Sequence, residues 1–161
     1  MKAGWNLLLP ALLLLPLTAQ GDTPPQIVLA TAGTAGASSG AVDMVATAAP
    51  GIKDILILGK VKALERLNSI DLIVLDAPAA GHAISFLRSP RGLLDAVSVG
   101  PINAQARDVL DMLTDPARCQ VMLVTLPEET PVNELVQTAY SLEDEVGVSL
   151  GPVVVNALYP T

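Results

Sequence analysis

The 161-residue sequence contains few aromatic residues and a single cysteine. Aromatic residues make up 2% of the chain and hydrophobic residues 51%, so we expect a core built from aliphatic side chains. Such cores are typical of parallel sheets whose strands are covered on both faces. The lone Cys119 excludes an internal disulfide, and its place beside a Val/Leu run favours a buried apolar role over that of a nucleophile.

Basic residues are scarce as well. Nine Lys and Arg residues stand against sixteen Asp and Glu residues, which gives a net charge of −7, and the basic residues are scattered along the chain. A nucleic-acid surface needs clustered positive charge, so we expect no nucleic-acid partner. One histidine, His82, and one cysteine cannot build a His/Cys metal cluster.

Residues 1–21 form an apolar leader. Lys2 precedes the apolar run at residues 7–17, and Ala19 and Gly21 are small enough for cleavage, so a signal peptide is one interpretation. The run is too short for a bilayer span and contains two prolines, so no stable transmembrane span is expected.

Residues 22–49 are rich in Gly, Ala, Ser, Thr and Pro, which predicts a linker, although residues 26–30 form a short apolar run. The pattern sharpens over residues 50–161, where we expect one folded domain. Apolar spacing there predicts helices at residues 52–67, 90–99, 105–113 and 131–146, and strands at residues 72–75, 120–126 and 152–156. This alternation predicts an α/β fold with a parallel sheet flanked by helices.

Polar residues follow each predicted strand, and ligands of such sheets bind at the carboxyl ends of the strands. The candidates are Asp76, then Pro127 and Glu128, then Asn156. A carboxylate at the end of a buried strand is costly unless it is paired. Asp76 would be paired by a metal ion held through water, or it would cap a helix that starts near His82. The residues alone leave both alternatives open.

The segment Asp76-Ala-Pro-Ala-Ala-Gly-His82 resembles the D-T-A-P-T-G-H segment of the arsenical pump-driving (ArsA) ATPase family, which includes targeting factors for tail-anchored membrane proteins. Four further segments, at residues 49–61, 86–91, 124–134 and 151–160, resemble the same family in the same order. The resemblance covers residues 49–160. It implies an incomplete P-loop NTPase-like domain of the SIMIBI type over residues 50–161.

The resemblance also implies ATP and Mg²⁺ as cofactors. It places Asp76 at water-held magnesium and the attacking water, His82 in the switch segment that reports nucleotide state, and Asn156 at the adenine ring. Pro127 and Glu128 would lie near the base or at a dimer surface. From the residues alone, Asn156 has the alternative role of satisfying a turn at the end of its strand.

The phosphate-binding loop of that family, G-K-G-G-V-G-K-T-T, is not evident, because no Gly-Lys-Ser/Thr occurs in the chain. The nearest candidate, residues 31–39, carries Ala32 and Ala37 at the two lysine positions. It is either a decayed loop or a flexible linker. We therefore expect a truncated or degenerate family member with little or no ATP hydrolysis on its own.

Three functions remain open from the sequence. The first is an ATPase-like protein of anion transport or membrane-protein targeting, in the cytoplasm. The second is a non-catalytic subunit that forms a homodimer, or a heterodimer with a complete ArsA-type ATPase. The third is an exported α/β protein that binds a small ligand, if the leader is genuine. An arsenite site is not expected, because Cys119 has no second cysteine beside it.

Overall fold

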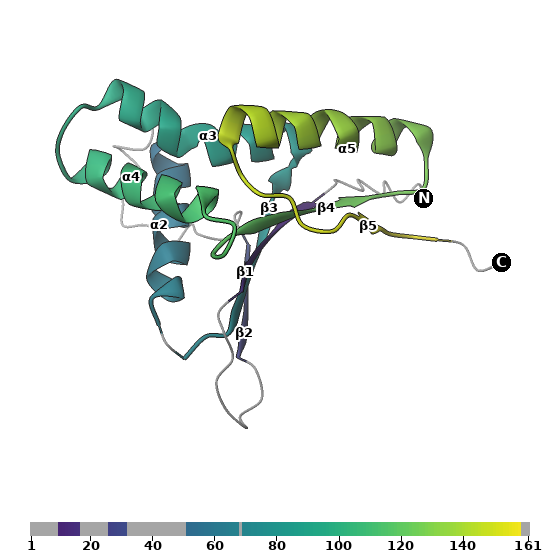
Figure 1. The fold of residues 1–161 in the computed structure, drawn as a ribbon, viewed down its shortest axis with the longest axis horizontal. Helices are drawn as coiled ribbons and strands as arrows, with labels where there is room; N and C mark the ends of the chain where they lie inside the picture. The colour runs from purple at the N-terminus through teal and green to yellow at the C-terminus, as the bar shows by residue number, and fades with distance from the viewer. Residues whose placement is uncertain (1–9, 17–25, 32–50, 68, 159–161) are drawn as a thin grey trace, which may run out of the picture.

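The computed structural model describes residues 10–16, 26–31, 51–67 and 69–158. It is a mixed α/β fold with a five-stranded sheet in the order β2-β3-β1-β4-β5 (Figure 1). The strands are β1 (Pro10–Pro16), β2 (Ile27–Thr31), β3 (Leu72–Ala79), β4 (Gln120–Thr125) and β5 (Val154–Val155). The helices are α2 (Ile52–Glu65), α3 (Ala80–Ala96), α4 (Pro101–Thr114) and α5 (Glu129–Ser141), followed by a π-helical turn, η1 (Leu142–Val146).

The three strands that the sequence predicts, β3, β4 and β5, run in one direction together with β2, and β1 runs in the opposite direction. Strand β2 is parallel to β3, and β4 is parallel to β5. Strand β1 lies between β3 and β4 and is antiparallel to both, so β3 and β4 point the same way. The expectation of a parallel arrangement is therefore correct for β3, β4 and β5, and the sheet as a whole must be corrected to a mixed one because of β1.

Two strands lie in segments for which the sequence predicts no folded structure. Strand β1 falls inside the apolar leader, and β2 falls inside the predicted linker. Both are apolar runs that satisfy their backbone groups on β3, which pairs with each of them. The remaining leader residues, 1–9 and 17–21, and the rest of the linker lie outside the described residues.

Helix α3 corrects the largest error in the predicted elements. The predicted helix began at Pro90, whereas α3 begins at Ala80 and contains Pro90 in its interior. A helical proline leaves the carbonyl four residues earlier without its amide donor. Here the Ser89 hydroxyl donates to that carbonyl, Phe86 O, at 2.8 Å. The lost backbone bond is thus replaced from the side chain.

Helix α5 also begins slightly earlier than its capping pattern suggested. Thr130 was the expected cap, but the helix starts at Glu129 and Glu128 occupies the cap position. Its far end is as predicted, because η1 terminates at Gly147, which has the left-handed φ of 81°.

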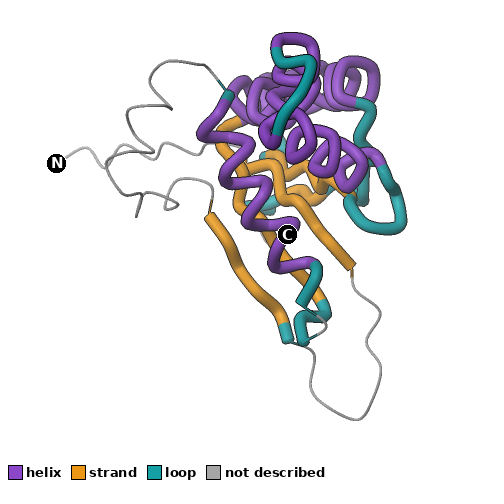
Figure 2. Tube along the Cα trace, turned by 90° about the vertical axis from the view of Figure 1, so that its left-hand side faces the viewer, coloured by secondary structure: helices purple, strands orange, loops and turns teal. Residues whose placement is uncertain are grey.

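The helices cover one face of the sheet. Alternate residues of β3 and β4, among them Ile73, Leu75, Val121 and Leu123, are buried in the main core. Figure 1 shows α2 beside one face of β1, β2 and β3, with no described helix on the opposite side, and Figure 2 gives the view at right angles. None of the described helices combines enough length with enough hydropathy to span a bilayer.

The opposite face, which we call the open face, is apolar and partly exposed. Ile27 and Leu29 of β2 are 59% and 72% exposed, respectively. They are level with Leu72 and Val74 of β3. The apolar residues of the open face are Ile27, Leu29, Leu72, Val74, Met122 and Val124, and the same alternation places Asp76 and Gln120 on this face.

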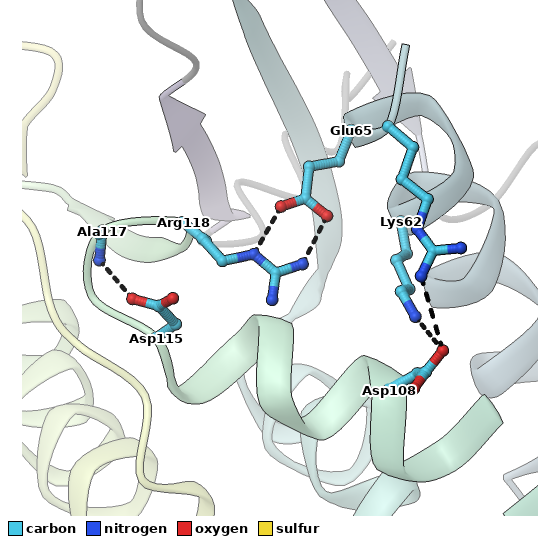
Figure 3. A network of polar contacts seen from close by, with 7 residues as sticks. Lys62, Glu65, Asp108, Asp115, Ala117 and Arg118 are labelled. Atoms are coloured by element: carbon cyan, nitrogen blue, oxygen red, sulfur yellow. Dashed lines mark hydrogen bonds and ion pairs between the residues drawn. The ribbon is translucent and has the colours of Figure 1, made fainter. Parts of the chain in front are cut away.

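Ion pairs join α2 to α4 and to the start of β4 (Figure 3). The Lys62 ammonium pairs with the Asp108 carboxylate, which holds the pKa of Asp108 below its usual value. Arg118 donates from Nε and Nη2 to the two carboxylate oxygens of Glu65 at 2.6 and 2.7 Å. The same bonds raise the pKa of Arg118. Together these pairs fix the helical layer against the sheet.

Candidate functional site

Strand β3 carries Asp76 in its interior, because the strand continues to Ala79, and the prediction that the strand ends before Asp76 is wrong. The apolar residues Leu72 to Leu75 drive strand formation, and Asp76 lies level with Thr31, the last residue of β2. The carboxylate is half-buried, and no hydrogen bond or ion pair joins it to another described residue. Burial of a carboxylate without a partner is costly, and the described residues supply no partner for this one.

His82 lies close to Asp76 in sequence but in a different element. It is the third residue of α3 and is exposed to solvent. Because α3 starts at Ala80, Asp76 lies four residues before the helix and does not occupy its cap position. The alternative that Asp76 caps this helix is therefore wrong. His82 lies in the first turn of α3 and is accessible to solvent.

Pro127 and Glu128 form the turn between β4 and α5. Both are exposed, and the Glu128 amide donates to Leu126 O at 2.8 Å. Glu128 O in turn accepts the amide of Val132 at 3.1 Å, which is a first-turn helical bond. The backbone of Glu128 is thus used by the helix, while its carboxylate faces solvent.

Asn156 follows β5 and is bonded to β4. Its amide donates to Thr125 O at 2.7 Å, which extends the β4–β5 pairing by one residue. Its side-chain Oδ1 accepts the Ala157 amide at 2.8 Å, and Ala157 has a φ of 55°. The turn-forming role for Asn156 is therefore present in the structure. It uses Oδ1 and leaves the side-chain Nδ2 without a described partner.

The sheet divides these residues into two groups. Pro127, Glu128 and Asn156 gather where β4 and β5 end, whereas Asp76 and His82 belong to β3 and α3. The order β3-β1-β4-β5 places three strand spacings between Asp76 and Asn156. At about 4.8 Å per spacing, this is a lateral separation of about 14 Å. Along the strands, Asp76 is level with Met122 through Leu12, whereas Asn156 is bonded to Thr125, three residues further on. Only a long ligand reaches both groups.

The described rim does not supply a complete metal or phosphate site. Within the described ranges, no group of three or more His, Cys, Asp or Glu side chains is arranged to hold a metal ion. Asp76 is therefore not part of a protein-built metal cluster among the described residues. Thr31 ends β2 beside Asp76, but the rest of the phosphate-loop candidate, residues 32–39, lies outside the described residues.

A second group of residues was not indicated by any sequence pattern. A cavity of about 630 Å³ lies between α2, α3 and α4 and is lined in part by Asp54. Burial raises the pKa of the Asp54 carboxyl. In the sequence, Asp54 resembles an ordinary acidic residue in the first turn of a helix, which is favourable at that position. Only the packing of three helices reveals the cavity.

Comparison with known proteins gives a consistent result. A family model described as "Anion-transporting ATPase" matches residues 26–99. The chain is 34% identical to "ATPase BagA" of Mycobacterium tuberculosis over 138 residues. The aligned region covers 82% of this chain and 40% of that protein. The same values hold for "Putative ATPase Mb3704" of Mycobacterium bovis. A "Putative arsenical pump-driving ATPase" of Halobacterium salinarum is 33% identical over 101 residues, 58% of this chain and 16% of the relative.

The matched range contains only some of the candidate site residues. The family match begins at residue 26, upstream of the residue-50 boundary predicted from the sequence, and it includes β2, α2, β3 and α3. Asp76 and His82 fall inside it, whereas Pro127, Glu128 and Asn156 fall beyond it. The chain spans 40% of the length of the two mycobacterial relatives.

Proposed function

Because the chain carries a domain of the anion-transporting ATPase (ArsA) family, we propose that its strand rim binds ATP with Mg²⁺ and that the chain alone hydrolyses ATP slowly or not at all. The observation that supports this proposal is Asp76. It is a half-buried carboxylate in the matched segment, inside the core strand β3 and three residues before its last residue, and has no described partner. In this proposal, Asp76 contacts a magnesium ion that arrives bound to the nucleotide.

The remaining rim residues follow from the shape of the ligand. The metal-bound phosphates and the base lie at opposite ends of ATP, so one nucleotide can address two separated groups of residues. We assign the phosphate end to Asp76 and His82. The base end belongs to Asn156, whose side-chain Nδ2 has no described partner, with Pro127 and Glu128 beside it.

Slow turnover follows from the missing lysines. The transferring phosphoryl group develops negative charge that must be stabilised by fixed cations and donors. The sequence has no Gly-Lys-Ser/Thr, and alanine occupies both lysine positions of the nearest loop. Binding survives this loss better than hydrolysis does, because binding also draws on the base and the metal.

The test separates binding from turnover in the purified full chain. Titration with a fluorescent ATP analogue should show saturable binding that weakens when Mg²⁺ is removed. Asp76→Ala should abolish the magnesium dependence, and Asp111→Ala, an exposed acid on α4, should leave it unchanged. Absence of magnesium-dependent binding would overturn the binding proposal. A clear hydrolysis rate that Asp76→Ala eliminates would overturn the proposal of inactivity.

A second candidate function is a non-catalytic subunit of a complete ATPase of the same family. The open face supports it, because its strands are apolar on both sides, a pattern typical of sheets covered on both faces. The relatives are more than twice as long as this chain, so their sequences contain additional segments that could cover such a face. The partner we propose is therefore a full-length family member rather than an unrelated protein.

Co-expression with a complete family ATPase from the same organism tests this second function. A tagged chain should recover the ATPase, and Leu29→Lys on the open face should reduce that recovery. Recovery that Leu29→Lys leaves unchanged would exclude the open face as the contact. A chain that is monomeric and recovers no ATPase would refute the subunit function.

We propose the cytoplasm as the location, because an ATP-dependent family needs a compartment that supplies ATP. Anion transport and membrane-protein targeting are equally compatible with the proposed nucleotide site. N-terminal sequencing of the mature chain tests the location. A start at Asp22 would show export and would favour the small-ligand-binding alternative, while a retained Met1 would remove it.

A further inference from the structure

The cavity between α2, α3 and α4 is separate from the nucleotide rim. Its volume of about 630 Å³ falls within the range of roughly 300–1,000 Å³ that is typical of small-molecule sites. The α2 start, the second half of α3 and the α4 start form its walls, and none of the candidate rim residues lines it. A ligand held there would not contact the candidate nucleotide residues.

The polar wall of the cavity includes an unpaired acid. Asp54 is half-buried, and no hydrogen bond or ion pair joins its carboxylate to another described residue. Loss of water around the carboxylate raises its pKa. A desolvated carboxylate without a counter-ion is destabilised, and a cation placed beside it would relieve that cost.

The C-terminus of α3 adds negative potential to the same cavity. Asp95, Ala96 and Val97 line it, and the last turn of α3 contains no basic residue. The carbonyl groups at a helix C-terminus carry partial negative charge and favour cations. Two acids and a helix C-terminus therefore face the cavity.

Two arginines also line the cavity, but both donate to the segment after α5. Arg88 Nη1 donates to the Glu145 carboxylate at 2.6 Å, so its charge is compensated within the protein. Arg91 Nη1 donates to the backbone oxygen of Glu145 at 3.0 Å. Both guanidinium groups thus donate to Glu145, and no described ion pair joins either of them to Asp54 or Asp95.

The other walls are apolar. Ile52, Leu93, Val97 and Ile102 line the cavity, and Ile102 is 40% exposed. Its ligand should therefore combine a positive charge with an apolar body. We propose that this cavity binds a small organic cation, a protonated amine on an apolar group, whose ammonium pairs with the Asp54 carboxylate.

Three probes of one size test the charge requirement in the full chain. Benzylamine is a cation, benzyl alcohol is neutral and benzoate is an anion, and all three present the same ring. In NMR titrations, benzylamine should bind saturably and at least tenfold more tightly than benzyl alcohol, with benzoate the weakest. Equal binding of all three probes, tighter binding of benzoate, or no saturable binding would overturn the proposal.

Variants locate the binding. Asp54→Asn should weaken benzylamine binding at least tenfold, and the matched control Asp111→Asn on α4 should not change it. Ile102→Lys is a second variant that introduces a competing ammonium at an exposed position of the wall, and it should weaken binding similarly. Unchanged affinity in either cavity variant would overturn the proposal. ATP binding should be the same in all variants, which separates this site from the nucleotide rim.

Discussion

The side chain of Ser89 has a role that only its place before a proline explains. Pro90 lies inside α3, and the carbonyl oxygen of Phe86 would otherwise lack its donor. The Ser89 hydroxyl donates to this oxygen at 2.8 Å in a buried environment. A buried carbonyl without a donor costs about 1–3 kcal/mol.

Ser89→Ala should therefore lower the free energy of unfolding by about 1–3 kcal/mol in urea titrations. In a Pro90→Ala background the cost should shrink, because the new amide of residue 90 can donate to Phe86 O. The double-mutant cycle measures this coupling. Equal costs of Ser89→Ala in both backgrounds would show that the hydroxyl does not replace the missing amide.

Asp54 carries a prediction about pH. Burial raises its pKa in the folded state above the unfolded value near 3.8, so ionised Asp54 lowers stability at neutral pH. Asp54 also lies in the first turn of α2, where the helix N-terminus favours the ionised form and opposes this effect. The other charged groups near Asp54 are Lys53, its neighbour in the sequence, and Arg88, Arg91 and Asp95 of α3.

Asp54→Asn should consequently raise the urea midpoint at pH 7. The difference from the unsubstituted chain should shrink as the pH falls through the folded pKa, and it should vanish below about 3.8, where both states bind the proton. A variant whose midpoint is lower at pH 7, or whose advantage persists at pH 3, would contradict the assigned cause.

At the scale of elements, the Glu65–Arg118 pair ties the end of α2 to the residue two positions before β4. Arg118 uses two nitrogens on two oxygens, a geometry that lysine cannot reproduce. The Glu65 side chain is largely buried, so the carboxylate would lose most of its compensation if the fork were broken.

Arg118→Lys should therefore cost about 1–2 kcal/mol of unfolding free energy, as expected for one lost charge-assisted hydrogen bond. Arg107→Lys is the matched control, because Arg107 is exposed on α4 and has no described partner. Chemical denaturation monitored by circular dichroism measures both. Equal effects of the two substitutions would refute the special role of the fork.

The elements also show how far sequence reasoning reaches. The apolar runs of β3 and β4 and the amphipathic α2 and α4 were predictable, because local periodicity determines them. The predicted start of α3 was ten residues too late, because Pro90 is typical of the first turn of a helix. A local sequence pattern does not show that the Ser89 hydroxyl compensates for a proline inside the helix. Strand β1 depends on pairing with partners more than fifty residues away.

The candidate site also has parts that the sequence predicts and parts that it does not. Asp76 was identified from its place after an apolar strand, and the structure leaves its carboxylate without a described partner. The separation of Asp76 from Asn156 was not predictable, because it follows from strand order. The cavity beside Asp54 was not predictable either, because it depends on how α2, α3 and α4 pack against one another.

At the scale of the whole molecule, the open face determines how the chain behaves in solution. Its strands are apolar on the side without described helices, where Leu29 is 72% exposed and Ile27 is 59% exposed. Apolar patches of this kind bind hydrophobic dyes and partner proteins. The net charge of −7 opposes non-specific association but does not cover the patch.

The chain should therefore enhance the fluorescence of the dye ANS in its folded state, and Leu29→Lys should reduce that enhancement by half or more. Leu67→Lys is the matched control, because Leu67 is also exposed, at 49%, but lies just after α2 and away from the open face. Both variants should keep the far-ultraviolet circular dichroism of the parent. Equal losses in the two variants would mean that the dye binds leucines in general. A selective loss in Leu29→Lys would identify the open face as the surface that a second polypeptide must cover.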